Sequence, residues 1–289
     1  MPEGDTVWAA AQRLNAALAG QKLTRTDFRV PRYATVDLSG RTVSEVLARG
    51  KHLLIRLDDG PVAGTTAESP STGQVTIHSH LKMEGSWHVY RSGGKWRRPA
   101  FTARVVLTTG AVTAVGFSLG TLEVLARSEE DQAVGHLGPD LLGPGWDADE
   151  AVRRLRTDPG RAIGLALLDQ RNLAGIGNVY RNELCFLSGV HPGAAVEEVP
   201  RLERLVETAQ RLLQVNRDRR VRTTTGFAAA GGADGMWVYG RGRQPCRRCG
   251  TLIEYGRLGT PTTIARDIYF CPFCQPPSSS GKVDTAGTE

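Results

Sequence analysis

The first residues of the chain follow the pattern of an amphipathic helix. Apolar side chains recur at three- and four-residue steps, which places them on one helix face. Gly20 follows the last of them, and glycine is common just after the end of a helix. We therefore expect a helix over residues 4–20 that buries one side. The apolar positions are Val7, Ala11, Leu14 and Leu18.

From about residue 22 to residue 126 the pattern changes to short β-type runs, separated by turns that contain Gly or Pro. These runs predict a β-sandwich or flattened barrel with the helix at its start. Residues 59–73 are small and polar, so a solvated hairpin insert is expected there. The clearest runs are residues 42–48, 52–57, 75–78, 102–107 and 111–115.

After about residue 128 the periodicity becomes helical. Segment 223–236 is rich in Gly, Ala and Thr, which fits either a mobile loop or a lid over a substrate. The candidate helices span residues 148–156, 161–169, 177–188 and 199–215. The predicted domains are a β-sandwich over 1–128, a helical domain over 129–236, a cysteine-bearing unit over 237–275 and a disordered tail over 276–289.

Composition narrows the class of protein. The chain has 289 residues, of which 40% are hydrophobic and 23% charged, so a core can be buried and wholesale disorder is excluded. A run of 18 apolar residues, as a spanning helix needs, is absent from the sequence. The acidic start Met1-Pro2-Glu3-Gly4-Asp5 lacks the profile of a secretory signal. We expect a cytoplasmic protein with no membrane partner.

Basic charge is concentrated in one segment. The whole chain carries a net charge of +6, whereas residues 201–250 hold eleven Arg against Glu203, Glu207, Asp218 and Asp234, a net charge of +7. Such a density suits a phosphate-binding face. A merely solvated basic surface is the alternative on charge alone. Nucleic acid is favoured, because the planar fork of Arg matches phosphate.

Four of the five cysteines form two C-x2-C pairs, Cys246/Cys249 and Cys271/Cys274. Two such pairs can aim four thiolates at one tetrahedral Zn²⁺. A redox pair is the competing interpretation, and the repeat of the pair favours zinc. Four thiolates leave no open position for a substrate, so the role would be structural and binding of the metal would drive folding. Cys185 lies in a helical pattern and is expected to be a buried small hydrophobe.

The beginning of the chain carries a candidate nucleophile. Removal of Met1 would leave Pro2 with a secondary amine as the first group of the chain. An α-amine has a reference pKa of about 8, far below that of Lys, so more of it is neutral and nucleophilic at pH 7. Its condensation with an aldehyde carbon gives an iminium that serves as an electron sink for β-elimination. Glu3 is the adjacent carboxylate that could move protons.

Five segments then combine into a specific signal. They are Met1-Pro-Glu-Gly-Asp, Arg49-Gly-Lys51-His52-Leu53, His80-Leu-Lys-Met83-Glu-Gly85, Leu173-Ala-Gly-Ile-Gly-Asn178-Val-Tyr-Arg-Asn-Glu183, and the four-cysteine unit with Arg266 before Cys271. In this order the sequence resembles the formamidopyrimidine-DNA glycosylase / endonuclease VIII family, and its Pro-Glu-Gly-Asp start resembles the endonuclease VIII branch. The resemblance covers residue 1 to about residue 275.

The resemblance implies a catalytic set. Pro2 would attack C1′ of a damaged nucleotide, expel the base and form a covalent imine, while Glu3 would donate and shuttle protons. Lys51 would reach a phosphate or the sugar, and Arg266, at the tip of the finger hairpin, would grip phosphates beside the lesion. Taken alone, Lys51 fits a solvated strand-end lysine and Arg266 a solvated arginine next to Asp267.

The resemblance also implies DNA contacts. Met83 would fill the gap left by the flipped nucleotide, and Lys82 would contact the orphaned strand. Asn178, in the turn of a helix–two-turn–helix motif, would hold a phosphate together with helix-terminal N–H groups. Glu183 would point toward the terminal amine, with a surface carboxylate as the alternative. Arg241 is assigned to the DNA-binding set.

Two histidines remain outside this set. His78 and His80 share one face of a predicted strand and could be metal ligands. A third ligand is not evident in the sequence, so a hydrogen-bonded pair of imidazoles is the favoured interpretation.

Together these features predict an α+β multidomain fold: an N-terminal β-sandwich with a flanking helix, a helical helix–two-turn–helix domain and a C-terminal β-hairpin zinc finger. The predicted function is a bifunctional DNA glycosylase and AP lyase that excises oxidised bases, pyrimidines before purines, and cuts by β,δ-elimination. The alternatives are an oxidised-purine glycosylase and a non-catalytic damaged-DNA binding protein. One structural Zn²⁺ and no organic cofactor are expected. The partner would be damaged duplex DNA, with single strands left open, bound by a cytoplasmic, nucleoid-associated monomer.

Overall fold

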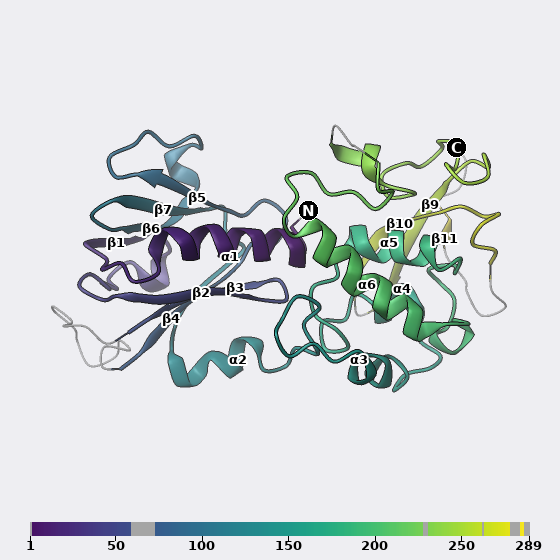
Figure 1. Cartoon of the computed structure of the whole chain (residues 1–289), viewed down its shortest axis with the longest axis horizontal. Coiled ribbons are helices and arrows are strands. Elements are labelled where there is room, and N and C mark those ends of the chain that lie inside the picture. Colours follow the sequence, from purple (N-terminus) through teal and green to yellow (C-terminus); the bar gives the residue numbers. More distant parts are fainter. Residues whose placement is uncertain (1, 59–72, 228–230, 262, 278–283, 286–289) are drawn as a thin grey trace. The chain divides into compact units, whose positions relative to one another are not determined.

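The computed structural model describes the chain except for residues 1, 59–72, 228–230, 262, 278–283 and 286–289 (Figure 1). It divides into two compact units, Met1–His136 and Leu137–Glu289, and each is described by itself. In the described part of the chain, none of the helices is long and apolar enough to cross a membrane. The predicted insert at 59–73 lies almost entirely outside the described residues.

The first unit contains two antiparallel four-stranded sheets, with strand orders β1-β6-β7-β5 and β2-β3-β4-β8. The five predicted strands are present as β2, β3, β4, β6 and β7, while β1, β5 and β8 were not predicted. The bounds are β1 Arg25–Phe28, β2 Val43–Arg49, β3 His52–Leu57, β4 Val75–His80, β5 Ser86–Arg91, β6 Ala103–Thr108, β7 Val112–Phe117 and β8 Thr121–Ala126.

Helix α1 (Gly4–Leu18) packs against strands of both sheets, β2 and β3 in one and β5 and β7 in the other (Figure 1). Its apolar face, including Val7, Leu14 and Leu18, is buried in one core with the inward residues of the sheets. The helix ends where predicted, and Gly20 adopts a φ of 75°. Since this helix begins directly after Glu3, its burial fixes the position of the chain's first residues. The unit also contains the short helix α2, Glu130–Val134.

The second unit is helical in its first part. The predicted helices are present, although α4 is one turn only and α6 begins three residues later than expected. The second core lies among them and contains Cys185, which is buried as predicted. The bounds are α3 Ala148–Leu155, α4 Ile163–Ala166, α5 Asn178–Leu187 and α6 Leu202–Asn216.

The last part of the chain forms a three-stranded sheet, β10-β9-β11, built on the hairpin of β9 (Glu254–Thr260) and β10 (Thr263–Phe270). The predicted disordered tail instead contributes β11 (Asp284–Thr285), which pairs with β9. A small core joins the hairpin region to α5 through Phe186. These findings confirm the predicted fold class. The four-part domain division stays a prediction.

Candidate active site and nucleic-acid interface

The start of the chain places a carboxylate at a helix N-terminus. Glu3 directly precedes α1 in an extended conformation, and its carbonyl oxygen accepts from the N–H of Val7 at 3.0 Å. The side chain of Glu3 is fully buried, whereas Pro2 is partly exposed. A negative charge is stabilised at this end of a helix dipole. The predicted nucleophile and its acid are therefore held by the most buried helix of the first unit.

Lys51 lies in the tight turn between β2 and β3. Gly50 adopts a φ of 57° in this turn, a conformation that favours glycine. Lys51 is half-buried. Its positive charge lowers the pKa of His80. His80 is near because it pairs across β3 and β4 with His52, the residue that follows Lys51. The predicted Lys51 and Lys82 are thus brought to one group of histidines.

A partly buried hydrogen-bonded chain runs across the sheet from β3 to β8. Nδ1 of His52 lies 2.8 Å from Nε2 of His78, and Nδ1 of His78 lies 2.7 Å from Oε2 of Glu123. A carboxylate only accepts, so Nδ1 of His78 carries the proton. In the tautomer of His78 that carries its hydrogen on Nδ1, Nε2 accepts from Nδ1 of His52. Through this arrangement Glu123 orders the tautomers of both rings, as a carboxylate does for a catalytic histidine.

The expected pairing of His78 with His80 is wrong. His78 bonds to His52 and Glu123, and Nδ1 of His80 instead accepts from the N–H of Lys82 at 2.9 Å. The ring of His52 stacks on that of His78 and meets that of His80 edge-on, each with 5.0 Å between centroids. Sequence analysis missed Glu123, because only the pairing of β4 with β8 places His78 opposite it.

Two rings of the histidine group, His52 and His80, have lowered pKa values. Burial, followed by the charges of His78, His80, His136 and Lys82, lowers the pKa of His52 to about 3. Burial, followed by Lys82, Lys51 and His78, lowers the pKa of His80 to about 4. At neutral pH the positive charge in this region therefore resides on the two lysines rather than on these two rings.

The predicted wedge residue stands on a tightly held turn between β4 and β5. Met83 exposes 60% of its surface. Lys82 adopts a φ of 54°, and the N–H of Gly85 donates to the carbonyl of Leu81 at 2.9 Å. Nη1 of Arg98 donates to the carbonyl of Glu84 at 3.2 Å. An exposed, flexible apolar side chain on a fixed turn has the form that insertion into a base stack requires.

In the second unit, Asn178 begins α5 and joins this helix to the finger hairpin. Its Nδ2 donates to the carbonyl of Asp267 at 3.0 Å, and its Oδ1 accepts from Arg181. Asn182, one turn on, accepts from the N–H of Tyr269 at 2.7 Å. Asn178 is buried, so its amide has a role inside the unit that was not predicted. The predicted phosphate contact stays a prediction.

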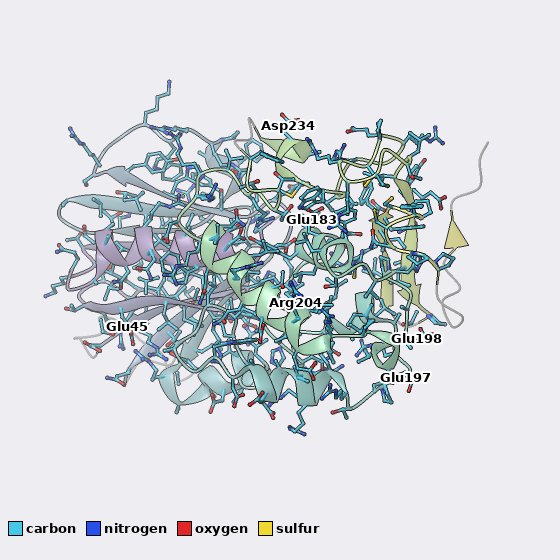
Figure 2. All side chains as sticks on the ribbon, turned by 45° about the vertical axis from the view of Figure 1, so that its right-hand side comes forward. Glu45, Glu183, Glu197, Glu198, Arg204 and Asp234 are labelled. Atoms are coloured by element: carbon cyan, nitrogen blue, oxygen red, sulfur yellow. The ribbon has the colours of Figure 1, made fainter. Side chains whose placement is uncertain are left out.

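Glu183 is fully buried on α5, and the predicted alternative of a surface carboxylate is wrong (Figure 2). Its carboxylate accepts from the backbone N–H groups of Trp237, Val238 and Tyr239 at 2.8–2.9 Å, and from the hydroxyl of Thr224. Burial raises the pKa of this carboxyl, and the four donors act in the opposite direction.

These bonds give Glu183 a role inside the second unit that was not predicted. Both carboxylate oxygens accept from the segment 224–239, and the predicted orientation toward the terminal amine stays a prediction. Asn216 adds to this anchoring, because its side chain bonds to both the N–H and the carbonyl of Thr223. The described ends of the predicted loop or lid, on both sides of residues 228–230, are thus tied to α5 and α6.

The two arginines predicted in the finger differ. Arg241 is buried, and its guanidinium donates to the carbonyls of Trp237 and Pro245 at 2.6 and 2.8 Å. These donors give Arg241 a structural role in its own loop, and the predicted DNA contact stays a prediction. Arg266 on β10 is exposed, and within the described residues no carboxylate pairs with it. Oδ1 of Asp267, the neighbouring acid, lies 3.8 Å from Nε of Arg257.

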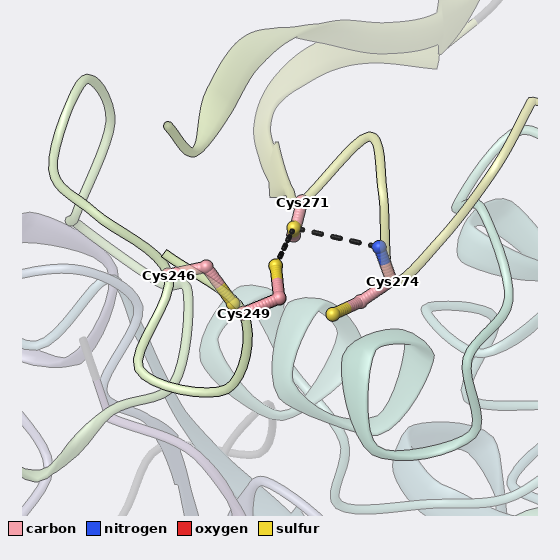
Figure 3. A group of neighbouring side chains, drawn as sticks. All are labelled: Cys246, Cys249, Cys271 and Cys274. Carbon is pink, nitrogen blue, oxygen red and sulfur yellow. Dashed lines mark hydrogen bonds between the residues drawn. The ribbon is translucent and has the colours of Figure 1, made fainter. Parts of the chain in front are cut away.

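The four cysteines converge as predicted. Figure 3 shows Cys246 and Cys249 on one loop and Cys271 and Cys274 on another, with their thiols turned toward one another. All four Sγ atoms lie within 4.8 Å of one another, and those of Cys249 and Cys271 are 3.4 Å apart. Four sulfurs around one ion at about 2.3 Å would be roughly 3.8 Å apart. The cluster therefore has the ligand type and spacing of a tetrahedral metal site.

Comparisons with known proteins agree with this arrangement. The formamidopyrimidine-DNA glycosylase N-terminal domain matches residues 1–118, and the formamidopyrimidine-DNA glycosylase H2TH domain matches residues 137–225. The chain belongs to this family. A probable endonuclease 8 2 of Streptomyces coelicolor is 55% identical over 95% of this chain and 94% of its own. The DNA-(apurinic or apyrimidinic site) lyase Nei2 of Mycolicibacterium smegmatis is 50% identical, over 95% and 99%.

A solved structure shows the same fold. The formamidopyrimidine-DNA glycosylase of Lactococcus lactis, in complex with DNA that contains an abasic site, superposes with a TM-score of 0.74 at 21% identity. The match covers 96% of this chain and 100% of that one. The two chains therefore share one fold over nearly their whole lengths.

Proposed function

We propose that this protein excises oxidised bases from DNA, pyrimidines before purines, and then cuts the strand by β,δ-elimination. As a member of the family it is a bifunctional DNA glycosylase and AP lyase of base excision repair. The preference for pyrimidines is supported by one observation, the 55% and 50% identity, over nearly the whole chain, with relatives named endonuclease 8 and AP lyase.

The chemistry begins at Pro2, once Met1 has been removed. The ring nitrogen loses its proton and bonds to C1′ as the bond from C1′ to the base breaks, and the departing base takes up a proton. The bond from C1′ to O4′ then breaks, O4′ takes up a proton, and the nitrogen lone pair forms the iminium. The resulting iminium acidifies C2′, whose deprotonation expels the 3′ phosphate; a second elimination expels the 5′ phosphate. Glu3 supplies and removes the protons. Its burial at the N-terminus of α1 supports this role, because a carboxylate there is kept next to the amine.

The remaining predicted residues bind the DNA. Lys51 and Lys82 supply ammonium groups to phosphates beside neutral histidines. The exposed guanidinium of Arg266 binds phosphates beside the lesion. Asn178, the first residue of α5, binds a phosphate together with the N–H groups at the start of that helix. Met83 enters the stack in place of the flipped nucleotide. The protein acts on duplex DNA as a monomer in the cytoplasm, associated with the nucleoid.

The finger holds one structural Zn²⁺ through Cys246, Cys249, Cys271 and Cys274. The distances among the thiols support this assignment, and a four-thiolate set leaves no position for a substrate. We expect Cys249→Ser to abolish both the zinc content and strand incision, with metal analysis and a nicking assay as the measurements. Cys185→Ser is the matched control, because Cys185 lies in the helical core. Full zinc stoichiometry in the Cys249 variant would contradict the assignment.

Borohydride trapping tests the proposed nucleophile. Wild-type protein with a processed N-terminus should form a covalent adduct with a thymine-glycol duplex and with an abasic duplex. Pro2→Gly should lose most of the trapped adduct while retaining DNA affinity in a gel-shift assay. An equal yield from protein that retains Met1 would refute the mechanism. Normal lesion affinity with no adduct in the wild type would identify a non-catalytic binder.

A panel of lesions separates the two glycosylase preferences. Thymine-glycol and oxidised-cytosine duplexes should be cut fastest. Faster cutting of 8-oxoguanine opposite cytosine would reassign the protein to the purine-directed branch without changing the imine chemistry.

A further inference from the structure

The arginines of the segment 201–250 fall into two groups. The guanidinium groups of the first group contact backbone carbonyls and aromatic rings of the second unit. Arg241 and Arg247 donate to backbone carbonyls. The guanidinium of Arg248 lies over the ring of Phe186 at 4.4 Å, and that of Arg222 over the ring of Tyr180 at 4.9 Å. The charge of this segment is therefore a poor guide to a single binding face.

A second group lines a cavity of about 600 Å³ beside α6. Arg204, Thr208 and Arg211 are spaced by four and three residues, which places them on one face of this helix. Arg201 stands at the N-terminus of the helix, and Arg204 is labelled on it in Figure 2. The floor is apolar. It is formed by Leu187, Val199, Pro200 and Leu205, with Ser188 at the end of α5.

The three arginines of this cavity form no ion pair within the described residues. Across the described ranges of the chain, no side-chain hydrogen bond or ion pair joins Arg201, Arg204 or Arg211 to a carboxylate. Glu203, the acid nearest in sequence, pairs with Arg156. Glu207 lies on α6 outside the lining, three residues after Arg204 and four before Arg211, and within the described residues it forms no ion pair with either. The cavity therefore combines three arginines with an apolar part of its lining.

The cavity lies at the opposite end of α5 from the predicted DNA contact. Asn178 begins this helix, whereas Leu187 and Ser188 at its other end line the cavity. Ten residues of α-helix span about 15 Å. A ligand in the cavity is thus separated from the phosphate site at Asn178, and a bare phosphodiester backbone would leave the apolar floor unused.

We propose that this cavity, lined by Arg201, Arg204 and Arg211, is a docking site for an acidic peptide segment of a partner protein. Carboxylates of the segment pair with the guanidinium groups, and one apolar side chain fills the floor. Such a site goes beyond base excision, because it would bring the enzyme to another protein without occupying the DNA-binding end of α5.

Peptide binding to the full-length protein tests this proposal. The probe is a fluorescein-labelled hexapeptide with two glutamates on each side of a leucine–phenylalanine pair. We expect binding in fluorescence polarisation that weakens with salt. Arg204→Ala and Arg211→Ala should each reduce affinity at least tenfold. Arg219→Ala, an exposed arginine beyond α6, is the matched control and should leave affinity unchanged. All variants should keep wild-type trapping on abasic duplex.

Two further peptides test the separate parts of the site. Replacement of the leucine–phenylalanine pair by alanines should abolish binding if the floor is used, and replacement of the glutamates by lysines should abolish it if the arginines are used. Undetectable binding up to about 1 mM, or binding that is unchanged in both cavity variants, would overturn the proposal. A tenfold loss of duplex affinity in these variants, without a loss of peptide affinity, would assign the arginines to DNA instead.

Discussion

Two carboxylates organise the two units, and they do so in different ways. Glu123 in the first unit leaves 34% of its side chain exposed and accepts from a side chain, the ring of His78. Glu183 in the second unit is fully buried and accepts from three consecutive backbone amides. One carboxylate sets the protonation pattern of rings, and the other sets the path of the main chain.

The difference bears on what each site tolerates. An imidazole ring that loses its acceptor can change tautomer, rotate or reach solvent. The hydrogen bond from His78 to Glu123 can therefore be replaced by another bond. Backbone amides at Trp237, Val238 and Tyr239 have no such freedom once they are buried, and an unmet buried donor costs about 1–3 kcal/mol. We therefore expect the Glu183 network to be the more rigid and the more costly to disturb.

The largest effect is expected from Glu183→Ala. Removal of the carboxylate leaves three amides and the hydroxyl of Thr224 without their acceptor, and the free energy of unfolding should fall by about 3–5 kcal/mol. Urea denaturation of the zinc-loaded protein measures this. Hydrogen exchange should localise the loss to residues 224–239. A loss below about 1 kcal/mol would contradict the anchoring role.

Acid should selectively weaken the histidine group. The folded pKa values of His52 and His80, about 3 and about 4, lie below the unfolded value of 6.5. Below pH 6.5 the unfolded chain takes up protons that the folded chain does not, so stability falls as pH falls toward the folded pKa values. The slope is at most about 1.4 kcal/mol per pH unit for each ring, and less for rings partly open to solvent.

The difference between wild type and His52→Gln isolates this contribution. The variant should be less sensitive than wild type to a change from pH 6.5 to pH 4.5, measured by urea denaturation at each pH. Parallel pH profiles of the two proteins would mean that His52 takes up its proton over the same pH range in the folded and the unfolded chain, which would contradict the lowered pKa.

A smaller effect should separate two substitutions at Glu123. The amide oxygen of Glu123→Gln can still accept from Nδ1 of His78, so stability should fall by no more than about 1 kcal/mol and the tautomers should persist. Glu123→Leu leaves that donor unpaired, and both rings should change tautomer. Long-range ¹⁵N–¹H correlation of the ring nitrogens measures this directly. Identical spectra of the two variants would show that Glu123 does not determine the tautomers of His78 and His52.

The smallest effect on stability is expected at Met83, which belongs to neither network. Because the side chain is exposed, Met83→Ala should change the free energy of unfolding by less than about 0.5 kcal/mol. Excision from a lesion duplex should nevertheless slow several-fold, because the gap left by the flipped nucleotide is no longer filled. Urea denaturation and single-turnover kinetics, run on the same preparations, separate the two outcomes.

The sequence predicted the elements best where one local pattern decides them. Helix α1 and the strands from β2 to β4 follow from apolar periodicity, and the four cysteines follow from their spacing. Strand β5, Ser86–Arg91, was missed because only one of its six residues is buried: Trp87 is buried, while the other five are partly or fully exposed. The strand exists because β7 supplies a partner.

The site was less accessible to sequence than the fold. Glu123 and His52 are 71 positions apart, and only the order β3-β4-β8 brings them to one chain of hydrogen bonds. Arg241 was assigned to the DNA-binding set, and its bonds to the carbonyls of Trp237 and Pro245 were not foreseen, because spacing along the chain does not show which carbonyls a guanidinium reaches. Glu183 was correctly singled out, but its partners are amides, which a sequence does not distinguish from any others.

The turn that carries Met83 has a consequence for redesigning the enzyme's lesion preference. A Cβ at Gly85 would collide with the carbonyl of Leu81, and one at Gly120 would collide with the stem of Lys82. Both glycines are therefore closed to mutation, while Met83 and Glu84 are open to it. A laboratory library for new substrate range should randomise Met83 and Glu84 and keep both glycines. The exposed side chains of the turn would then vary while its backbone conformation stays the same.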